Sequence, residues 1–325
     1  MIRVGFVGTG GFTRHHVEIL RGIENVKVVG FVGSSQEKAE HFAKSYDETT
    51  GYKDVETMLS YEQLDAVYIC VPPMAHENYE EILVDHGIPF LVEKPLGIDV
   101  EKVRSVRDKI KETNHLTAVG YHFRYADTVK KFQEMLEGTT SGVVLGKWMG
   151  SMPEVDWWRR QDQSGGQFNE QTTHIVDLIR FLFGEVTSVY ALENNLTNKN
   201  PSVTVADVGL FTLTLESGLS VQLTNTSVLP EGTGDIGIKT YTDQGIVEWR
   251  LGHVEKRTAA KIEKYLARQN PYRRENEGFL HAVKTGDRSK ILSDYEDAWR
   301  SFKVAMAAQK SILEGRVVYV SEMDE

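Results

Sequence analysis

Two side chains far apart in this sequence are suited to chemistry on a polar substrate. Lys94 stands in the stretch "FLVEKPLG", where Glu93 separates it from three apolar residues that have the pattern of the end of a buried strand. A cation at such a strand end can stabilise negative charge that develops on a substrate oxygen. His174 lies in "SGGQFNEQTTHIVDLIRFLFG", and an imidazole with a pKa of about 6.5 can exchange a proton at neutral pH. Taken alone, however, a helical histidine more often has a structural role.

The residues around His174 have the periodicity of a helix that follows a polar Gly-Gly loop and ends near Gly184. At about 100° per residue, Glu170, His174 and Asp177 fall within one narrow stripe, with apolar residues on the adjoining faces. The helix therefore carries titratable groups along its first turns, which is favourable for a catalytic histidine but does not establish one.

A glycine loop follows the first apolar run of the chain, in "GTGGFTRHH". Gly8 and Gly10 match the first two glycines of G-x-G-x-x-G, and Thr13 occupies the third position. The first glycine permits a tight turn, and the second lets backbone amides approach a pyrophosphate at a helix N-terminus. Because the loop joins a strand to a helix, it predicts dinucleotide binding. We interpret the His15–His16 doublet in that helix as local packing and solvent exposure.

The second strand of a NAD-binding fold usually ends in an acidic residue that holds the ribose 2′-hydroxyl. Here it ends in "GFVGSSQEK", which supplies Ser34, Ser35 and Lys38. Two hydroxyls and a cation could accept a 2′-phosphate, so NADP is favoured over NAD as the cofactor. An equally good interpretation is that the two serines only cap the next helix.

In the first part of the chain, the hydrophobic pattern alternates between that of strands and that of helices, and these elements position the residues named above. Short β-rich runs, apolar throughout, alternate with amphipathic helical patterns, which is typical of a doubly wound α/β domain with a parallel sheet. In such sheets ligands bind at the carboxyl ends of the strands. We assign residues 1–121 to this Rossmann domain.

Residues 122–325 are expected to form an α+β domain with a large, mostly antiparallel open sheet. Two hairpins are predicted, with turns at Ser217–Gly218 and Gln244–Gly245. A last helix, about 293–314, is expected to open with a capping box from Ser293 to Glu296 and to pack back on the first domain.

Composition excludes several classes of function. The 325 residues carry a net charge of -10, which argues against nucleic-acid binding. No apolar run is long enough to span a membrane, and no targeting leader precedes the first strand. The single cysteine, Cys70, fits a reducing compartment, so we expect a cytoplasmic protein. No spacing of histidines, cysteines and carboxylates resembles a closed metal site, and none is predicted.

The motifs "GTGGF", "VPPMAH", "VEKPLG", "VGYHFRY" and "SGGQFNEQTTHIVDLIRFLFG" occur in an order and spacing that resemble one family over nearly the whole chain. This is the glucose–fructose oxidoreductase, inositol 2-dehydrogenase and rhizopine-catabolism (Gfo/Idh/MocA) family. The resemblance implies reversible NAD(P)-dependent oxidation of a secondary alcohol on a sugar, cyclitol or related polyol. It implies that Lys94 contacts substrate and cofactor and that His174 takes the hydroxyl proton.

The resemblance also assigns binding residues by position. Those expected to contact the cofactor are Gly8, Thr9, Gly10, Gly11, Phe12, Ser34, Ser35, Lys38, Pro72, Pro73, His76, Glu93 and Lys94. Those expected to contact the substrate are Tyr121, Arg124, Trp157, Trp158, Gln171 and His174. Alternatives remain open for four of these: a helix start for His76, a structural ion pair for Arg124, and core packing for Trp157 and Trp158.

One position departs from the family pattern. Many relatives place an aspartate four residues before the histidine, where this chain has Glu170, followed by Gln171. Glutamate keeps the charge but reaches about one methylene further, so Glu170 is expected to support His174 while inositol-type specificity becomes doubtful.

Two other functions are compatible with the same scaffold. The first is a different reaction, such as reduction of an imine or a double bond, or an NAD-dependent glycosidase. The second is a non-catalytic, dinucleotide-binding regulator, which would not need both Lys94 and His174. As partners we expect a small-molecule substrate and a second copy of the chain, in a homodimer or homotetramer that uses the semi-polar face of the open sheet.

Overall fold

The computed structural model describes residues 1–324, which divide into two compact units. The first unit contains Met1–His122 and Asn270–Trp299, and the second contains Phe123–Gln269 and the chain from Arg300 onward. Both expected fold classes are confirmed, a parallel Rossmann sheet and a mostly antiparallel open sheet. None of the described helices combines the length and apolar character needed to cross a bilayer.

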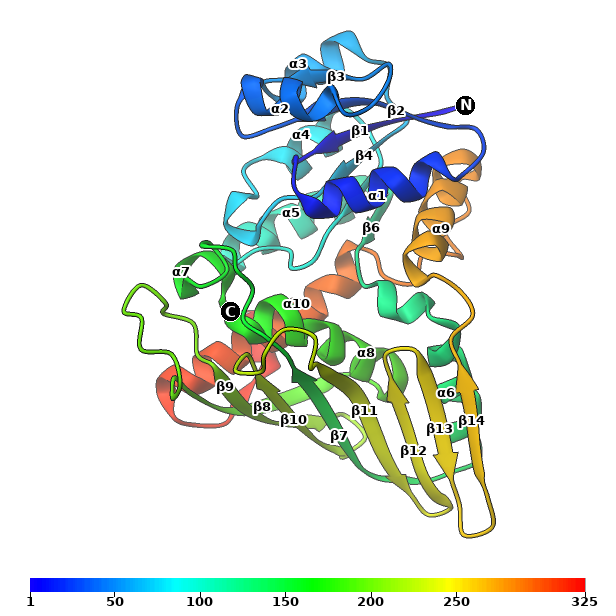
Figure 1. Ribbon diagram of the computed structural model, residues 1–325, viewed down its shortest axis with the longest axis vertical. Helices are drawn as coiled ribbons and strands as arrows, with labels where there is room; N and C mark the ends of the chain where they lie inside the picture. The colour runs from blue at the N-terminus through cyan, green and yellow to red at the C-terminus, as the bar shows by residue number, and fades with distance from the viewer. Residues whose placement is uncertain (325) are drawn as a thin grey trace. The chain divides into compact units, whose positions relative to one another are not determined.

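The first unit contains a six-stranded parallel sheet in the order β3-β2-β1-β4-β5-β6 (Figure 1). Buried aromatic side chains from its strands, among them Phe6, Phe31 and Tyr68, form one core. The strands are β1 (Ile2–Val7), β2 (Val26–Val32), β3 (Thr50–Tyr52), β4 (Ala66–Ile69), β5 (Phe90–Val92) and β6 (Thr117–Val119). The helices are α1 (Gly11–Arg21), α2 (Gln36–Ala43), α3 (Val55–Tyr61), η1 (Pro73–Ala75), α4 (Tyr79–Asp85), α5 (Val100–Thr113) and α9 (Pro271–Thr285).

Residues 270–299 were expected in the second domain, and the structure places them in the first unit. The reason is that α9 buries Phe279, whose ring lies 5.6 Å from that of Tyr68 in the edge-on arrangement favoured by aromatic pairs. The chain passes between the two units more than once, and the expected boundary after residue 121 lies at the first of these passages.

The second unit contains a nine-stranded sheet in the order β14-β13-β12-β11-β7-β10-β9-β8-β15 (Figure 1). Every neighbouring pair is antiparallel except β10 and β7. The strands are β7 (Ser141–Met149), β8 (Val186–Asn194), β9 (Val208–Leu215), β10 (Ser220–Thr226), β11 (Asp235–Thr242), β12 (Gly245–Arg250), β13 (His253–Arg257), β14 (Ile262–Leu266) and β15 (Val318–Tyr319). The two expected hairpins are β9–β10 and β11–β12.

The helical segments with residues in the second unit are η2 (His122–Tyr125), α6 (Asp127–Leu136), α7 (Gln161–Ser164), η3 (Phe168–Thr172), α8 (Thr173–Phe183), α10 (Tyr295–Glu314) and η4 (Val320–Met323). Helix α8 packs on the inner face of the sheet at Gly146, where an added Cβ would lie 2.9 Å from Ile175. At the start of α10 the expected capping box is replaced by Asp294, whose Oδ1 accepts a hydrogen bond from the Asp297 amide at 2.9 Å.

Candidate active site

The glycine loop between β1 and α1 has the geometry that a pyrophosphate needs. Gly8 has a φ of +110°, and a Cβ there would lie 2.2 Å from the carbonyl oxygen of Cys70, so only glycine fits. Thr13, at the third position of the motif, is buried and donates a hydrogen bond to the Gly8 carbonyl at 3.0 Å. A Cβ on Gly10 would meet nothing within 4 Å, which leaves the N-terminus of α1 open to a phosphate.

At the end of β2 the structure shows the helix cap, which was one of the two interpretations that the sequence left open. Ser35 caps α2, because its side chain accepts the Lys38 amide at 3.3 Å. The Lys38 ammonium in turn donates to the Ser34 hydroxyl at 3.0 Å. A cavity of about 740 Å³ lies beside them and is also lined by Arg14, a cation that sequence reasoning missed although it follows the glycine loop by a few residues.

Lys94 lies two residues beyond the end of β5 and is only 8% exposed. Its ammonium lies 5.9 Å from the centre of the Phe12 ring, within cation–π range. Phe12, near the start of α1, is 47% exposed. The structure therefore brings two of the expected cofactor residues together within the first unit.

Glu93 does not share this surface, because its side chain turns inward. Its Oε1 lies 2.9 Å from Nε2 of His16, and both residues are buried. The His15–His16 doublet was interpreted as local packing and solvent exposure, and the structure divides the two: His15 is exposed and His16 is buried.

Three residues could hold a metal ion within the described part of the first unit. His16, Glu93 and Glu275 each offer one ligand atom, and these atoms lie within 4.8 Å of one another. However, both ring nitrogens of His16 already have hydrogen-bond partners, Glu93 on one side and Asn276 on the other. His16 and Glu93 are therefore already held by hydrogen bonds within the protein.

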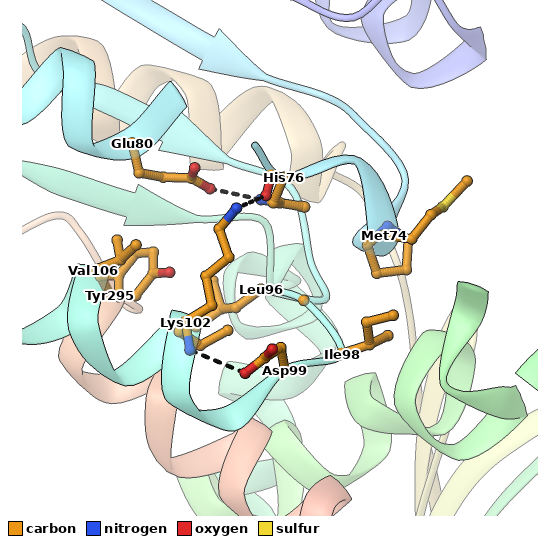
Figure 2. Close-up of a pocket in the computed structure, with 12 residues that line it drawn as sticks. Met74, His76, Glu80, Leu96, Ile98, Asp99, Lys102, Val106 and Tyr295 are labelled. Atoms are coloured by element: carbon orange, nitrogen blue, oxygen red, sulfur yellow. Dashed lines mark hydrogen bonds and ion pairs between the residues drawn. The ribbon is translucent and has the colours of Figure 1, made fainter. Parts of the chain in front are cut away.

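His76 is held in place from two helices, as Figure 2 shows. Its Nδ1 lies 2.6 Å from the Glu80 carboxylate, and its carbonyl accepts a hydrogen bond from the Lys102 ammonium. A cavity of about 250 Å³ lies beside these groups and is also lined by Pro73 and Leu96. His76 thus anchors the segment between β4 and α4. Tyr121, expected to contact substrate, is 1% exposed in the same unit.

In the second unit His174 is 5% exposed and packs against two aromatic rings that also contact each other, with 6.2 Å between their centroids. The Trp148 ring is nearly parallel to the imidazole, at 5.7 Å and 15°, and the Phe123 ring lies at 5.0 Å and 39°. These contacts fix the plane of the imidazole. Neither aromatic residue was identified from the sequence, although Phe123 belongs to the motif "VGYHFRY".

The helix that carries His174 is not regular at its start. Residues 168–172 form a π-helical turn, which often occurs at functional sites. The turn contains Glu170, which is half-buried, and Gln171, whose Oε1 accepts a hydrogen bond from Gln167 at 3.1 Å. Glu170 lies in this π-helical turn, whereas His174 and Asp177, the other two residues of the expected stripe, lie in the regular helix α8.

Asp177 belongs to an ion pair instead. Its carboxylate accepts two hydrogen bonds from Arg124, at 2.7 and 2.6 Å, and both side chains are buried. Of the two roles left open for Arg124, the structural ion pair is therefore the one observed. Trp158 is 2% exposed and packs in the core, whereas Trp157 is half-buried.

Together these features define a class of protein: an oxidoreductase with a dinucleotide-binding Rossmann domain and a second domain that contains an open sheet. The comparisons with known proteins name the family. The model of the oxidoreductase family with a NAD-binding Rossmann fold matches residues 2–121, and that of the GFO/IDH/MocA C-terminal domain matches residues 140–248. The chain belongs to the Gfo/Idh/MocA family, whose members act on CH–OH groups.

Similar proteins cover the whole chain at low identity. Inositol 2-dehydrogenase of Rhizobium meliloti is 24% identical over 339 residues, which cover 98% of this chain and 99% of the relative. A Desulfitobacterium hafniense protein, provisionally described as NADPH-dependent oxidoreductase, has a TM-score of 0.90 at 21% identity, covering 100% and 99%. GenD2 of gentamicin A biosynthesis, solved in complex with NAD, has a TM-score of 0.84 at 22% identity, covering 98% and 96%.

Proposed function

We propose that this protein is an NAD(P)-dependent dehydrogenase that interconverts a secondary alcohol and a ketone on a sugar, cyclitol or related polyol. The observation that carries the proposal is the setting of His174. A buried imidazole packed against Trp148 and Phe123, next to a π-helical turn, has the fixed orientation that proton transfer requires. The names of the family's inositol and apiose dehydrogenases support the choice of substrate class.

In this proposal a bound nicotinamide supplies the hydride acceptor, and the chain's own residues do the rest. The turn at Gly8 and the amides at the start of α1 hold the pyrophosphate. His174 accepts the proton of the substrate hydroxyl, and Lys94 stabilises the negative charge that develops on that oxygen. Glu170 binds a neighbouring substrate hydroxyl or orients His174.

The proposed cofactor preference is for NADP. Support comes from the Ser34–Lys38 hydrogen bond and from the guanidinium of Arg14 at the same cavity. A Lys38→Ala variant should bind NADPH roughly 10-fold or more weakly, because a hydrogen bond to a charged group contributes about 1.5–3 kcal/mol. Binding of NADH should be unchanged. Equal losses for both cofactors, measured by fluorescence titration, would contradict the preference.

The function is tested by a screen of sugars, inositols and sugar acids with both cofactors, followed by nicotinamide absorbance. With the best substrate, His174→Ala should lower kcat at least ~100-fold while cofactor affinity is retained. Lys94→Ala should impair both kcat and substrate affinity, and Lys130→Ala, on α6, serves as a control. Deuterium transfer from labelled cofactor to product separates net hydride transfer from a redox-neutral glycosidase cycle. Unchanged turnover in His174→Ala would remove that residue from its role.

We also propose a homodimer or homotetramer in the cytoplasm. The outer face of the nine-stranded sheet exposes the apolar side chains of Leu145, Tyr190, Leu192 and Leu210 beside polar threonine and glutamine side chains. Such a mixed surface is typical of the face that a second subunit covers. The buried free thiol of Cys70 fits a reducing compartment. A monomer in light scattering at all concentrations would contradict the assembly.

A further inference from the structure

The cavity of about 250 Å³ beside His76 lies within the first unit, because all the described residues that line it belong to that unit. They come from the segments that follow β4 and β5 and from helices α4, α5 and α10. The glycine loop and Lys94 are not among them. At about 30 Å³ for each molecule of liquid water, the volume equals that of roughly eight waters. The cavity can therefore hold a small organic molecule.

Two buried polar side chains meet at this cavity. His76 is 7% exposed and Glu80 is 1% exposed, and Nδ1 of His76 lies 2.6 Å from Oε1 of Glu80. The second polar atom of each side chain, Nε2 of His76 and Oε2 of Glu80, is also buried, and neither has a hydrogen-bond partner among the described residues. Such atoms are rare in proteins, because leaving them unpaired is destabilising. They indicate a polar partner from outside the chain.

Lys102 and Tyr295 add to the polar side of the cavity. The Lys102 ammonium donates a hydrogen bond to the His76 carbonyl, and Figure 2 shows the Glu80 carboxylate, the His76 side chain and this ammonium converging. Burial, and then the negative charges of Glu80 and Glu81, raise the pKa of Tyr295, so its hydroxyl keeps its hydrogen. The polar groups are therefore gathered together and held by contacts within the unit.

Most of the remaining lining is apolar. Pro73, Leu96, Val103 and Val106 are buried side chains that border the cavity. Water molecules find no hydrogen-bond partners along such a surface, whereas a hydrocarbon group gains from leaving water there. An apolar lining with a few convergent polar groups is the usual form of a site for a small molecule.

The chemical class of the ligand follows from the two unpaired atoms. If His76 carries its hydrogen on Nδ1 only, Nε2 accepts a hydrogen bond, and if both nitrogens carry hydrogens, Nε2 donates one. Oε2 of an ionised Glu80 accepts. A hydroxyl group both donates and accepts, so it can pair with these atoms in either protonation state of the imidazole.

We propose that this cavity binds a small alcohol, whose hydroxyl pairs with His76 and Glu80 and whose hydrocarbon part packs against Val103 and Val106. This inference goes beyond the dehydrogenase function and does not depend on it. It gives His76 a ligand of its own, where the sequence assigned this residue to the cofactor.

Cyclohexanol is the probe, because it combines one hydroxyl with an apolar ring. In NMR titrations of protein with labelled methyl groups, the signals of Leu96 and Val103 should shift and saturate. Cyclohexanone has the same ring but only accepts hydrogen bonds, so it leaves the Glu80 oxygen unpaired and should bind at least ~10-fold more weakly. Titrations without cofactor exclude any turnover of either probe.

Two variants fill the cavity with a larger side chain. Val106→Phe and Val103→Phe should each weaken cyclohexanol binding at least ~10-fold, because the ring of the probe and the new ring need the same space. Val100→Phe is the matched control, since Val100 is a half-buried residue of the same helix outside the lining, and it should stay within ~3-fold of wild type. Unchanged binding in a folded Val106→Phe or Val103→Phe protein would overturn the inference.

The same titration with saturating NADPH or NADH separates this cavity from the cofactor site. The dissociation constant of cyclohexanol should stay within ~3-fold, and displacement by either cofactor would show that the cavity belongs to the cofactor site instead. No saturation by ~10 mM, or equal affinity for cyclohexanone, would also contradict the proposal. A crystal soaked in cyclohexanol should show its ring beside Val103 and Val106, and waters alone would refute it. None of these readouts requires hydride transfer, so they stand if the proposed dehydrogenase activity fails.

Discussion

Asp177 of α8 is the residue whose replacement best separates a structural from a substrate-binding role of Arg124. Its carboxylate accepts from Nε and Nη2 of Arg124 at 2.7 and 2.6 Å and from the Ser301 hydroxyl at 2.9 Å. Arg180 lies 3.7 Å away. The Arg124 and Asp177 side chains are 4% and 1% exposed, so solvent does not screen the pair. Asp177→Asn keeps the shape of the side chain but removes the charge that neutralises Arg124.

The size of the effect follows from these contacts. Removing one partner of a buried ion pair costs about 3–5 kcal/mol, because the other charge stays in a poorly hydrated place. Asparagine can still accept one hydrogen bond, so about 3 kcal/mol is expected. For a cooperative unit of roughly 150–250 residues, each kcal/mol lowers the melting temperature by about 2–4 °C. Asp177→Asn should therefore lower it by about 6–12 °C.

Differential scanning calorimetry measures this shift, and initial rates on the same samples at 20 °C measure activity. The matched control is Asp162→Asn, which removes the carboxylate of the exposed Arg160–Asp162 pair and should leave the melting temperature unchanged. A fall of less than about 2 °C in Asp177→Asn, together with a raised KM, would refute the reasoning. That outcome would return Arg124 to the substrate site.

Three further predictions concern other parts of the chain. Gly8→Ala should weaken cofactor binding at least ~100-fold in a titration, because its Cβ would lie 2.2 Å from a backbone oxygen. Burial, and then the charge of Lys94, lowers the pKa of His122 from 6.5 to about 3. As the pH is lowered from 6.5 toward 3, His122 becomes protonated in the unfolded chain before it does so in the folded protein, so the free energy of unfolding falls. His122→Phe should remove part of this loss of stability between pH 7 and 4. Burial raises the pKa of Glu193 from 4.5 to about 7, so stability falls as the pH rises through this window. Glu193→Gln should be more stable than wild type at pH 8, by up to about 3 kcal/mol, and equal to it at pH 4 in urea unfolding.

The fold could be predicted because its signals are local. The parallel strands β1, β2, β4 and β5 are short runs that are apolar except for Arg3 and Lys27 near the starts of β1 and β2, and the hairpins β9–β10 and β11–β12 have clear alternation around glycine turns. Each pattern depends on neighbours within about ten residues. The glycine loop was predictable for the same reason, since Gly8 must adopt a positive φ where β1 turns into α1.

The side-chain partners were not predictable in this way. Arg124 and Asp177 are 53 residues apart, and nothing in either segment identifies the other as its partner. The π-helical turn at residues 168–172 was not predictable either. A single turn is too short to change the periodicity of apolar residues along a helix in a way that the sequence reveals. The stripe predicted for this helix therefore included Asp177, whose carboxylate is paired with Arg124.

His16 shows why such errors concentrate at the site. A histidine next to a second histidine in an amphipathic helix has no local feature that distinguishes a buried side chain from an exposed one. Its burial is decided by Asn276, from a helix that the sequence placed in the other domain, and by Glu93, which was assigned to the cofactor. A buried polar group needs hydrogen-bond partners, and these partners often come from distant parts of the chain. Whether such a residue is buried therefore depends on contacts that a local sequence pattern does not contain. The side chains of His16 and Glu93 are of this kind, and the structure was needed to identify their partners.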